Sequence, residues 1–384
     1  MIRVVADTYG IEFEYDSEAF NLRQVDGGGI VNLANLYTEH CKMKKADRQD
    51  HLKILAAVFG ERNAELPHDF EDAKLNLRAK IWNRSIIEFS QLKSQVSGES
   101  AIDIPHLPVG SHLIASIVFD TEHAMRSLTP DCLAEWGVSF EDAMKIAIQN
   151  VDDATTAFGK IGDNMFSSMT GDAYDSSRVL ASKRIESFDL QGDAIAMVPN
   201  RETFMVAGSK DATALKILFE LSAKAVEDDT QRPLCPLPMI RRDGVWHDWV
   251  PPKNHALRED FEVRQTYFLA ELYDEQKTLL EQRVLAGVVD ETAFIASFSG
   301  IQRDENDPMQ SYCVWGRGVE TLLPQTQYVF FADGDNAVAS AEWDHVLQVA
   351  GELMEKDESY YPARFRVTQF PSDEQIQSLG NVLG

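Results

Sequence analysis

In residues 112–120, the positions between His112 and Asp120 are all apolar except for one serine. A run of this length predicts a strand that is buried on both faces of a sheet. Two further β-favouring runs, residues 193–198 and 203–207, flank the turn-forming residues 199–202. This pattern predicts a β-hairpin. The middle of the chain therefore contains a central strand followed by a hairpin.

Helical spacing is clearest in residues 211–226, where apolar side chains recur on one stripe. Residues 257–286 have the length of a long helix, and many charges interrupt the apolar stripe. This interruption is typical of a helix that connects domains. Residues 30–37 and 52–59 also have helical spacing. For residues 73–92 we predict a helix, and a strand is the alternative because Ile81 and Ile86-Ile87 favour β structure.

The pattern changes to β type after residue 288, and the order of elements to the end of the chain is β-β-β-α-β-α. At 384 residues, the chain exceeds the length that one hydrophobic core supports, which is roughly 250 to 300 residues. We therefore predict an α+β protein with several domains. They are an N-terminal hairpin and helical region at 1–100, an α+β module with a central sheet at 101–252, a connecting helix at 253–287 and a smaller α+β domain at 288–384.

Acidic residues outnumber basic ones by 62 to 36, which gives a formal net charge of −26. A negative field repels phosphate backbones and anionic membranes, so nucleic acid is an unfavourable partner. The acidity itself is typical of a surface that keeps a protein soluble, and the alternative is a basic ligand or protein partner. No apolar stretch is long enough to span a membrane, and no secretion signal is present at the start. The four cysteines are far apart and contain no C-x-x-C pair. We expect a cytoplasmic protein with reduced thiols.

Several short segments in residues 22–250 occur in the order typical of one family. They include residues 30–37, residues 117–129, the Trp136-Gly137-Val138-Ser139 segment, residues 172–177 and residues 198–202. In this order the chain resembles the YtpQ family, domain-of-unknown-function family 1444, which is mostly bacterial. Glu202 stands where the family pattern has an aspartate. The resemblance implies a related fold and brings no established activity with it.

Polar residues at a strand end and in the hairpin turn form the strongest candidate site. Asp120 ends the predicted central strand and Arg126 follows it, while Asn200, Arg201 and Glu202 occupy the turn. Loops at strand ends often carry binding groups, and arginine suits carboxylate or phosphate. The alternative is a structural network in which the arginines pair with the acids and the asparagine caps the turn.

Other chemistries have weaker support. The acids Asp333 and Asp335 follow an apolar run as in haloacid dehalogenase phosphatases, but too little chain remains for the downstream groups that such a site needs. The histidines match no zinc spacing, and residues 27–29 are three glycines that lack a phosphate-loop lysine. We predict no cofactor and no metal.

The lack of a complete catalytic set favours a non-catalytic binding or adaptor protein for a protein partner or a small ligand. The alternative hypothesis is an enzyme that acts on an anionic substrate through an Asp/Arg cleft. It requires Asp120, Arg126 and Arg201 to converge.

Overall fold

The computed structural model describes residues 12–25, 30–62, 66–98, 100–121, 124–162, 164–227, 233–289, 291–302, 304 and 307–382. The chain forms two units, and it passes between them within two strands, β4 (Leu77–Asn83) and β6 (Leu113–Asp120). Unit 1 comprises residues 1–79 and 116–153, and unit 2 comprises residues 80–115 and 154–384. The glycines at 27–29 and the β-favouring run at residues 2–5 lie outside the described residues. The predicted domain boundaries stay predictions.

Unit 1 is mainly helical and carries a small antiparallel sheet in the order β1-β2-β3. Thr129 caps its α6 helix, because the hydroxyl accepts from the backbone N–H of Cys132 and proline occupies the first helical position. The Asn150 amide donates to the carbonyls of Lys74 and Leu77. These bonds hold the helix at residues 140–153 against residues 74–77. The elements are β1 (Phe13–Asp16), β2 (Asn21–Gln24), β3 (Ile30–Asn32), α2 (Ala34–Lys42), α3 (Arg48–Arg62), α4 (Phe70–Ala73), η1 (Lys74–Asn76), β7 (Met125–Ser127), α6 (Pro130–Trp136) and α7 (Phe140–Asp153).

The prediction of a helix over residues 73–92 is wrong for residues 77–83, which form a strand, and is confirmed for residues 85–92. The structure has strand β4 from Leu77 and helix α5 from Ser85, while Leu75, which belongs to the predicted stripe, is 75% exposed. In β4 the alternate residues Leu77, Ala79 and Ile81 are fully buried. A period of two therefore overrides the apparent helical spacing, because the strand places these three side chains on one face.

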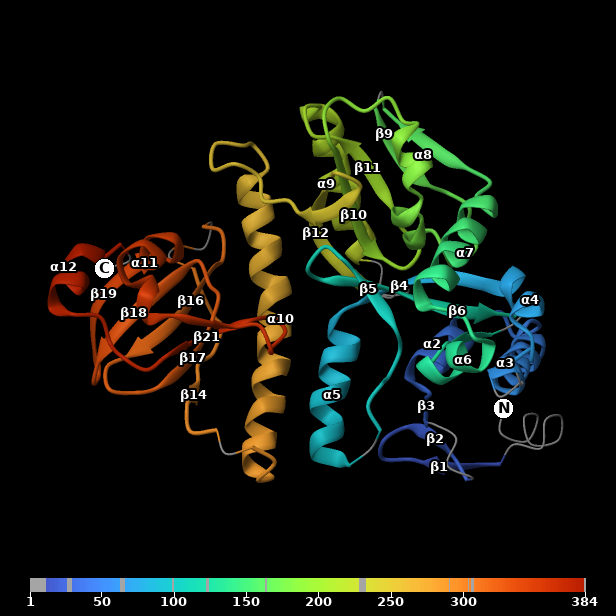
Figure 1. Ribbon diagram of the computed structural model, residues 1–384, viewed down its shortest axis with the longest axis horizontal. Helices are drawn as coiled ribbons and strands as arrows, with labels where there is room; N and C mark the ends of the chain where they lie inside the picture. The colour runs from blue at the N-terminus through green and yellow to red at the C-terminus, as the bar shows by residue number, and fades with distance from the viewer. Residues whose placement is uncertain are drawn as a thin grey trace. The chain divides into compact units, whose positions relative to one another are not determined.

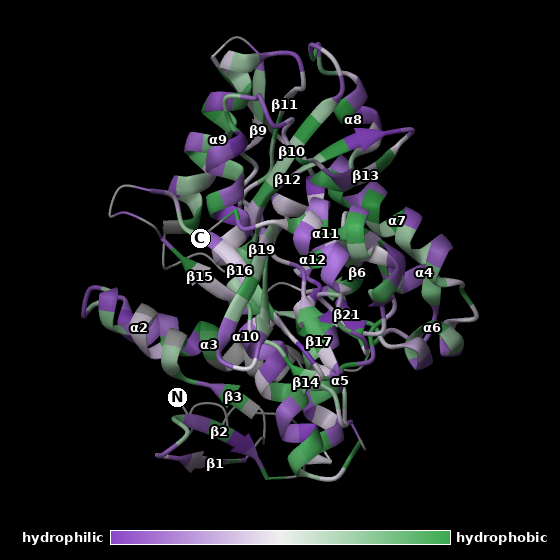
Figure 2. Ribbon diagram, turned by 90° about the vertical axis from the view of Figure 1, so that its left-hand side faces the viewer, coloured by the Kyte–Doolittle hydropathy of each residue, from purple (hydrophilic) through white to green (hydrophobic). Residues whose placement is uncertain are grey.

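Unit 2 contains an antiparallel six-stranded sheet in the order β13-β12-β10-β11-β9-β8. Helix α9 packs on this sheet, and in Figure 2 β10 and β12 are mostly hydrophobic while α9 alternates between hydrophobic and hydrophilic bands. Asp243 and Gly244 both have positive φ in the β12–β13 turn, a conformation typical of two-residue hairpin turns. The elements are β8 (Phe158–Ile161), β9 (Met165–Ser168), η2 (Ser176–Leu180), α8 (Ser182–Glu186), β10 (Ala194–Asn200), β11 (Met205–Gly208), α9 (Ala212–Glu227), β12 (Pro233–Arg242) and β13 (Val245–Asp248).

The C-terminal part of unit 2 holds two four-stranded sheets, β14-β17-β21-β20 and β15-β16-β18-β19. Both contain one parallel pair, β14 with β17 and β16 with β18. Their shared core is rich in aromatic residues, including Trp315, Phe331, Trp343 and Phe365. The elements are β14 (Phe294–Ile295), β15 (Ser299–Ile301), β16 (Gln310–Gly316), β17 (Thr321–Pro324), β18 (Tyr328–Asp333), β19 (Asn336–Glu342), α11 (Trp343–Ala350), η3 (Gly351–Leu353), β20 (Glu355–Asp357), β21 (Arg364–Val367) and α12 (Asp373–Leu379).

Helix α10 (Arg258–Leu285) lies between these sheets and helix α5 (Ser85–Ser97) in Figure 1. Strand β5 (His106–Val109) belongs to the sheet that also holds β4, β6 and β7. The predicted α+β class is confirmed, with 37% helix and 30% strand. Among the described residues, no helix is long and apolar enough to cross a membrane.

Arg364 joins α10 to the C-terminal sheets and is fully buried. Its Nε donates to Gln276 Oε1 at 2.6 Å, and its Nη1 donates to the carbonyls of Ala296 and Leu322 at 2.9 and 3.0 Å. Burial lowers the pKa of this guanidinium to about 10. A single side chain thus fixes the helix, the segment after β14, and β17.

We expect Arg364→Met to lower the free energy of unfolding by about 3 to 5 kcal/mol, because it leaves buried acceptors without donors. Urea-induced unfolding measures the change. The matched control is Arg317→Met, whose guanidinium is 40% exposed and pairs with Asp333 at 2.8 Å. This change should lower the free energy of unfolding by less than about 1 kcal/mol. Equal stability of the two variants would contradict the role given to Arg364.

Candidate functional site

Asp120 and Arg126 lie in unit 1 on the neighbouring strands β6 and β7. The register pairs Arg126 with Phe119 and Asp120 with Met125. Because successive residues of a strand point to opposite faces, the two side chains leave the β6–β7 ribbon on opposite sides. Each of the two residues also makes an interaction within the protein.

The predicted turn residues lie in unit 2, and Asn200 serves the fold. Its side chain is fully buried, donates to the carbonyl of Ala225 at 2.8 Å and accepts from the N–H of Glu202 at 3.0 Å. The Arg201 guanidinium lies 4.5 Å from the centre of the Trp82 ring, a cation–π contact. Glu202 is exposed. Convergence of the whole predicted set therefore stays a prediction, as does the enzyme hypothesis that requires it.

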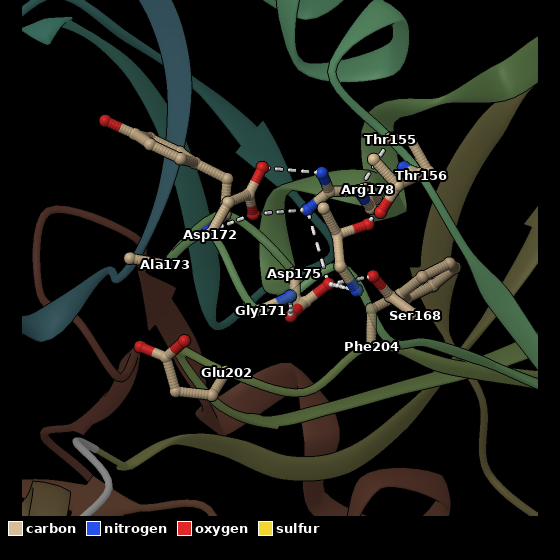
Figure 3. Close-up of polar contacts among 12 residues, drawn as sticks. Thr155, Thr156, Ser168, Gly171, Asp172, Ala173, Asp175, Arg178, Glu202 and Phe204 are labelled. Carbon is tan, nitrogen blue, oxygen red and sulfur yellow. Dashed lines mark hydrogen bonds and ion pairs between the residues drawn. The ribbon is translucent and has the colours of Figure 1, made fainter.

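The densest polar cluster follows strand β9 and centres on Arg178 (Figure 3). The fully buried guanidinium binds both carboxylate oxygens of Asp172 at 2.8 Å and also contacts Asp175 at 3.3 Å. Its Nε donates to the Thr155 hydroxyl at 2.6 Å. Asp175 in turn accepts from the Ser168 hydroxyl and from the N–H groups of residues 170 and 171. Glu202 has no dashed contact to this cluster in Figure 3.

A second buried cation, Lys80, stabilises the same loop. It donates to the carbonyl of Ala173 and lies 4.6 Å from the centre of the Tyr174 ring. Ala173 has a φ of 63°, a conformation that side chains other than glycine seldom adopt. Arg178 and Lys80 thus both bind residues of one loop, and the main donors of Arg178 are occupied. This cluster fixes the loop from residue 168 to residue 181.

A cavity of about 560 Å³ lies within unit 2, beside α10. Segments that are distant in the sequence supply its walls, including α10, the two residues before β6, the end of β13 and residues 356–363. The lining residues are Arg84, Ser111, His112, Asp248, Val250, Gln265, Thr266, Leu269, Tyr273, Phe298, Ser311, Gln325, Thr326, Gln327, Lys356, Glu358, Tyr360, Tyr361, Pro362 and Ala363.

His112 and Tyr361 meet at this cavity. The His112 Nδ1 atom lies 3.0 Å from the Tyr361 hydroxyl, and the imidazole edge contacts the Phe268 ring at a centroid distance of 5.1 Å. Burial lowers the pKa of His112, Asp248 opposes this shift, and Arg84 adds to it. The imidazole is therefore neutral at pH 7. Burial also raises the pKa of Tyr361 well above its usual range, so both groups are uncharged.

Amide and hydroxyl groups continue the uncharged lining. Gln327 Oε1 accepts from the N–H of Ser311 at 2.8 Å and from the Thr266 hydroxyl at 3.3 Å. Within the described part of the chain, the Gln265 side chain makes no hydrogen bond or ion pair, so its amide is available. The stacked rings of Tyr273 and Phe298, 5.5 Å apart, add an apolar surface.

The charged groups of the lining balance one another. Arg84 pairs with Glu88 at 2.9 Å, and Lys356 pairs with Glu358 at 2.7 Å. Asp248 accepts from the backbone N–H of Ser111 at 2.9 Å. The cavity thus contains two cations and two carboxylates and has no surplus charge to attract an ion.

The described residues contain no group of three or more metal-ligating side chains. Burial raises the pKa of the Cys235 and Cys313 thiols to about 12, so neither is a thiolate nucleophile at neutral pH. His112 begins the strand run predicted from the sequence, but 249 positions separate it from Tyr361. Only the fold brings them together.

Comparison of the chain with protein-family models, with curated proteins and with solved structures gave no match. The resemblance to the YtpQ family stays a prediction.

The Asp172–Arg178 pair should make stability depend on pH in the acid range. Burial raises the pKa of Asp172, but the hydrogen bonds and charge of Arg178 outweigh this effect and lower it. A lowered pKa in the folded state means that the contribution is complete above about pH 4 and is lost as pH falls through the lowered value. Urea unfolding across this range should show a loss that is absent in Asp172→Asn.

Asp335→Asn is the control, because Asp335 is an exposed carboxylate in the β18–β19 turn. It should keep the acid profile of the unmodified protein. An Asp172→Asn profile that matches the unmodified protein would contradict the assignment.

Proposed function

We propose that the protein is a non-catalytic binding protein whose cavity beside α10 holds a small, uncharged ligand with several hydrogen-bonding groups. The observation that carries the proposal is the uncharged lining provided by His112, Gln265 and Gln327. These residues offer donors and acceptors without a net charge. We refer to this space as the His112 cavity.

The size of the His112 cavity suits a small molecule. Pockets for small ligands commonly measure about 300 to 1,000 Å³ and combine apolar walls with a few polar groups that fix orientation. The 560 Å³ of this cavity falls in that range. The Phe298 ring supplies an apolar face, and the Gln265 amide supplies a donor and an acceptor.

The charge of the lining favours uncharged ligands over anions. Arg84 and Lys356 are already paired with carboxylates, so an incoming phosphate would have to compete with Glu88 and Glu358. The net charge of −26 adds long-range repulsion. A neutral polyol, sugar or amide avoids both costs.

Paired ligands that differ by one phosphate test this proposal. We expect glucose or inositol, or another uncharged member of a polyol, sugar and amide panel, to bind at least about tenfold more tightly than its phosphorylated form. Gln265→Ala should weaken the binding of that ligand by at least about tenfold, because it removes an amide that has no protein partner among the described residues and is available to the ligand. Isothermal titration calorimetry measures both effects.

The control is Gln282→Ala, since Gln282 is an exposed glutamine on the same helix and does not line the cavity. It should bind as the unmodified protein does. Tighter binding of the phosphorylated partners, or a panel in which no uncharged member binds, would refute the proposal.

A further inference from the structure

A smaller cavity of about 130 Å³ lies at the C-terminal end of α10 and shares Tyr360 with the His112 cavity. Aliphatic residues of α10, β14 and β17 line it, together with three polar side chains. The lining consists of Leu280, Arg283, Val284, Val289, Glu291, Ile295, Leu322 and Tyr360. Its volume is below the range for small-molecule pockets and corresponds to one side chain.

Arg283 is the unusual member of this lining. Its Nε atom is enclosed and has no hydrogen-bond acceptor, and within the described ranges its guanidinium makes no hydrogen bond or ion pair. Buried polar groups are nearly always bonded, so an enclosed donor without an acceptor indicates a missing partner. The nearby Arg366 shows the contrast, because it binds both Glu291 and Glu320.

We propose that this cavity binds the C-terminal residue of a peptide or protein partner, with an aliphatic side chain in the cavity and the terminal carboxylate on Arg283. A guanidinium binds a carboxylate through two parallel hydrogen bonds. Leu280, Ile295 and Leu322 belong to one buried apolar cluster and form the apolar wall.

A chain terminus fits this cavity better than an aspartate or glutamate side chain does. One and the same small cavity is lined by the guanidinium and by the aliphatic groups, so a single residue must supply both the carboxylate and the apolar side chain. Within a polypeptide, only the C-terminal residue carries both on one Cα atom. The competing carboxylate, Glu291, is already held by Arg366 and by the N–H of Ala293 at 3.0 Å.

The surface around the cavity is apolar as well. Leu285 is 87% exposed and Phe294 is 56% exposed, and Val284 and Val288 are exposed beside them in the sequence. A group of exposed large apolar side chains at one helix end is typical of a protein interaction surface. Tyr360 lines the cavity too, and burial raises the pKa of its phenol, so the hydroxyl stays protonated and can donate.

Short fluorescent peptides that end in leucine test the proposal. Their fluorescence anisotropy is measured as the full-length chain is added. One peptide has a free C-terminal carboxylate, and its partner has a C-terminal amide. We expect saturable binding of the acid and at least about tenfold weaker binding of the amide. Arg283→Gln should abolish this difference, since glutamine retains a hydrogen-bonding amide but neither the charge nor the reach of the guanidinium.

Arg242→Gln is the matched control, because Arg242 is an exposed arginine in the β12–β13 hairpin. It should bind both peptides as the unmodified protein does. No saturable binding of the acid, equal binding of acid and amide, or a difference that survives Arg283→Gln would overturn the proposal. Binding of an uncharged ligand to the His112 cavity shows that a variant chain is folded. A negative result with the peptides can therefore be distinguished from a negative result at the His112 cavity.

Discussion

The guanidinium of Arg364 is completely enclosed, and the acceptors of its hydrogen bonds are the Gln276 amide and backbone carbonyls. Removing a charge from water is costly unless its donors are all bonded, so the surrounding chain must keep these oxygens in place. The acceptors come from α10, from the segment after β14, and from β17. The position of α10 against the C-terminal sheets therefore follows from the need to supply hydrogen-bond acceptors to one buried cation.

Both cavities depend on this arrangement. Gln276, which accepts from Arg364, also donates to the carbonyl of Pro362 at 2.7 Å, and the Tyr273 hydroxyl donates to the carbonyl of Ala363 at 2.7 Å. These bonds fix the residues next to Tyr361 and so place its hydroxyl on His112. Leu322, whose carbonyl accepts from Arg364, lines the smaller cavity. The same helix thus positions the walls of both cavities.

The sequence patterns predicted those elements that depend on interactions between residues close together in the sequence. The apolar run that forms β6 and the β10–β11 hairpin depend on neighbouring residues, and the structure confirms both predictions. The helix prediction failed for the first part of residues 73–92 because this segment fits both a helical spacing and the period of two of a strand. The pairing of His112 with Tyr361 could not be predicted, since no local pattern links residues that only tertiary packing brings together.

Whether a polar side chain has partners separates groups that serve the fold from groups that serve a ligand. Arginine and asparagine in a turn or at a strand end suggest a site, yet Asn200 uses both ends of its amide within the protein, and Arg178 is held by two carboxylates and a hydroxyl. Gln265 and Arg283 carry the same kinds of polar groups without partners among the described residues. Because an unbonded polar group at a cavity wall costs free energy that a ligand recovers, these two residues are better candidates for binding than the more conspicuous turn. Residue type alone does not tell which polar side chains serve the fold and which serve a ligand. That depends on the hydrogen bonds and ion pairs that each side chain makes in the folded chain.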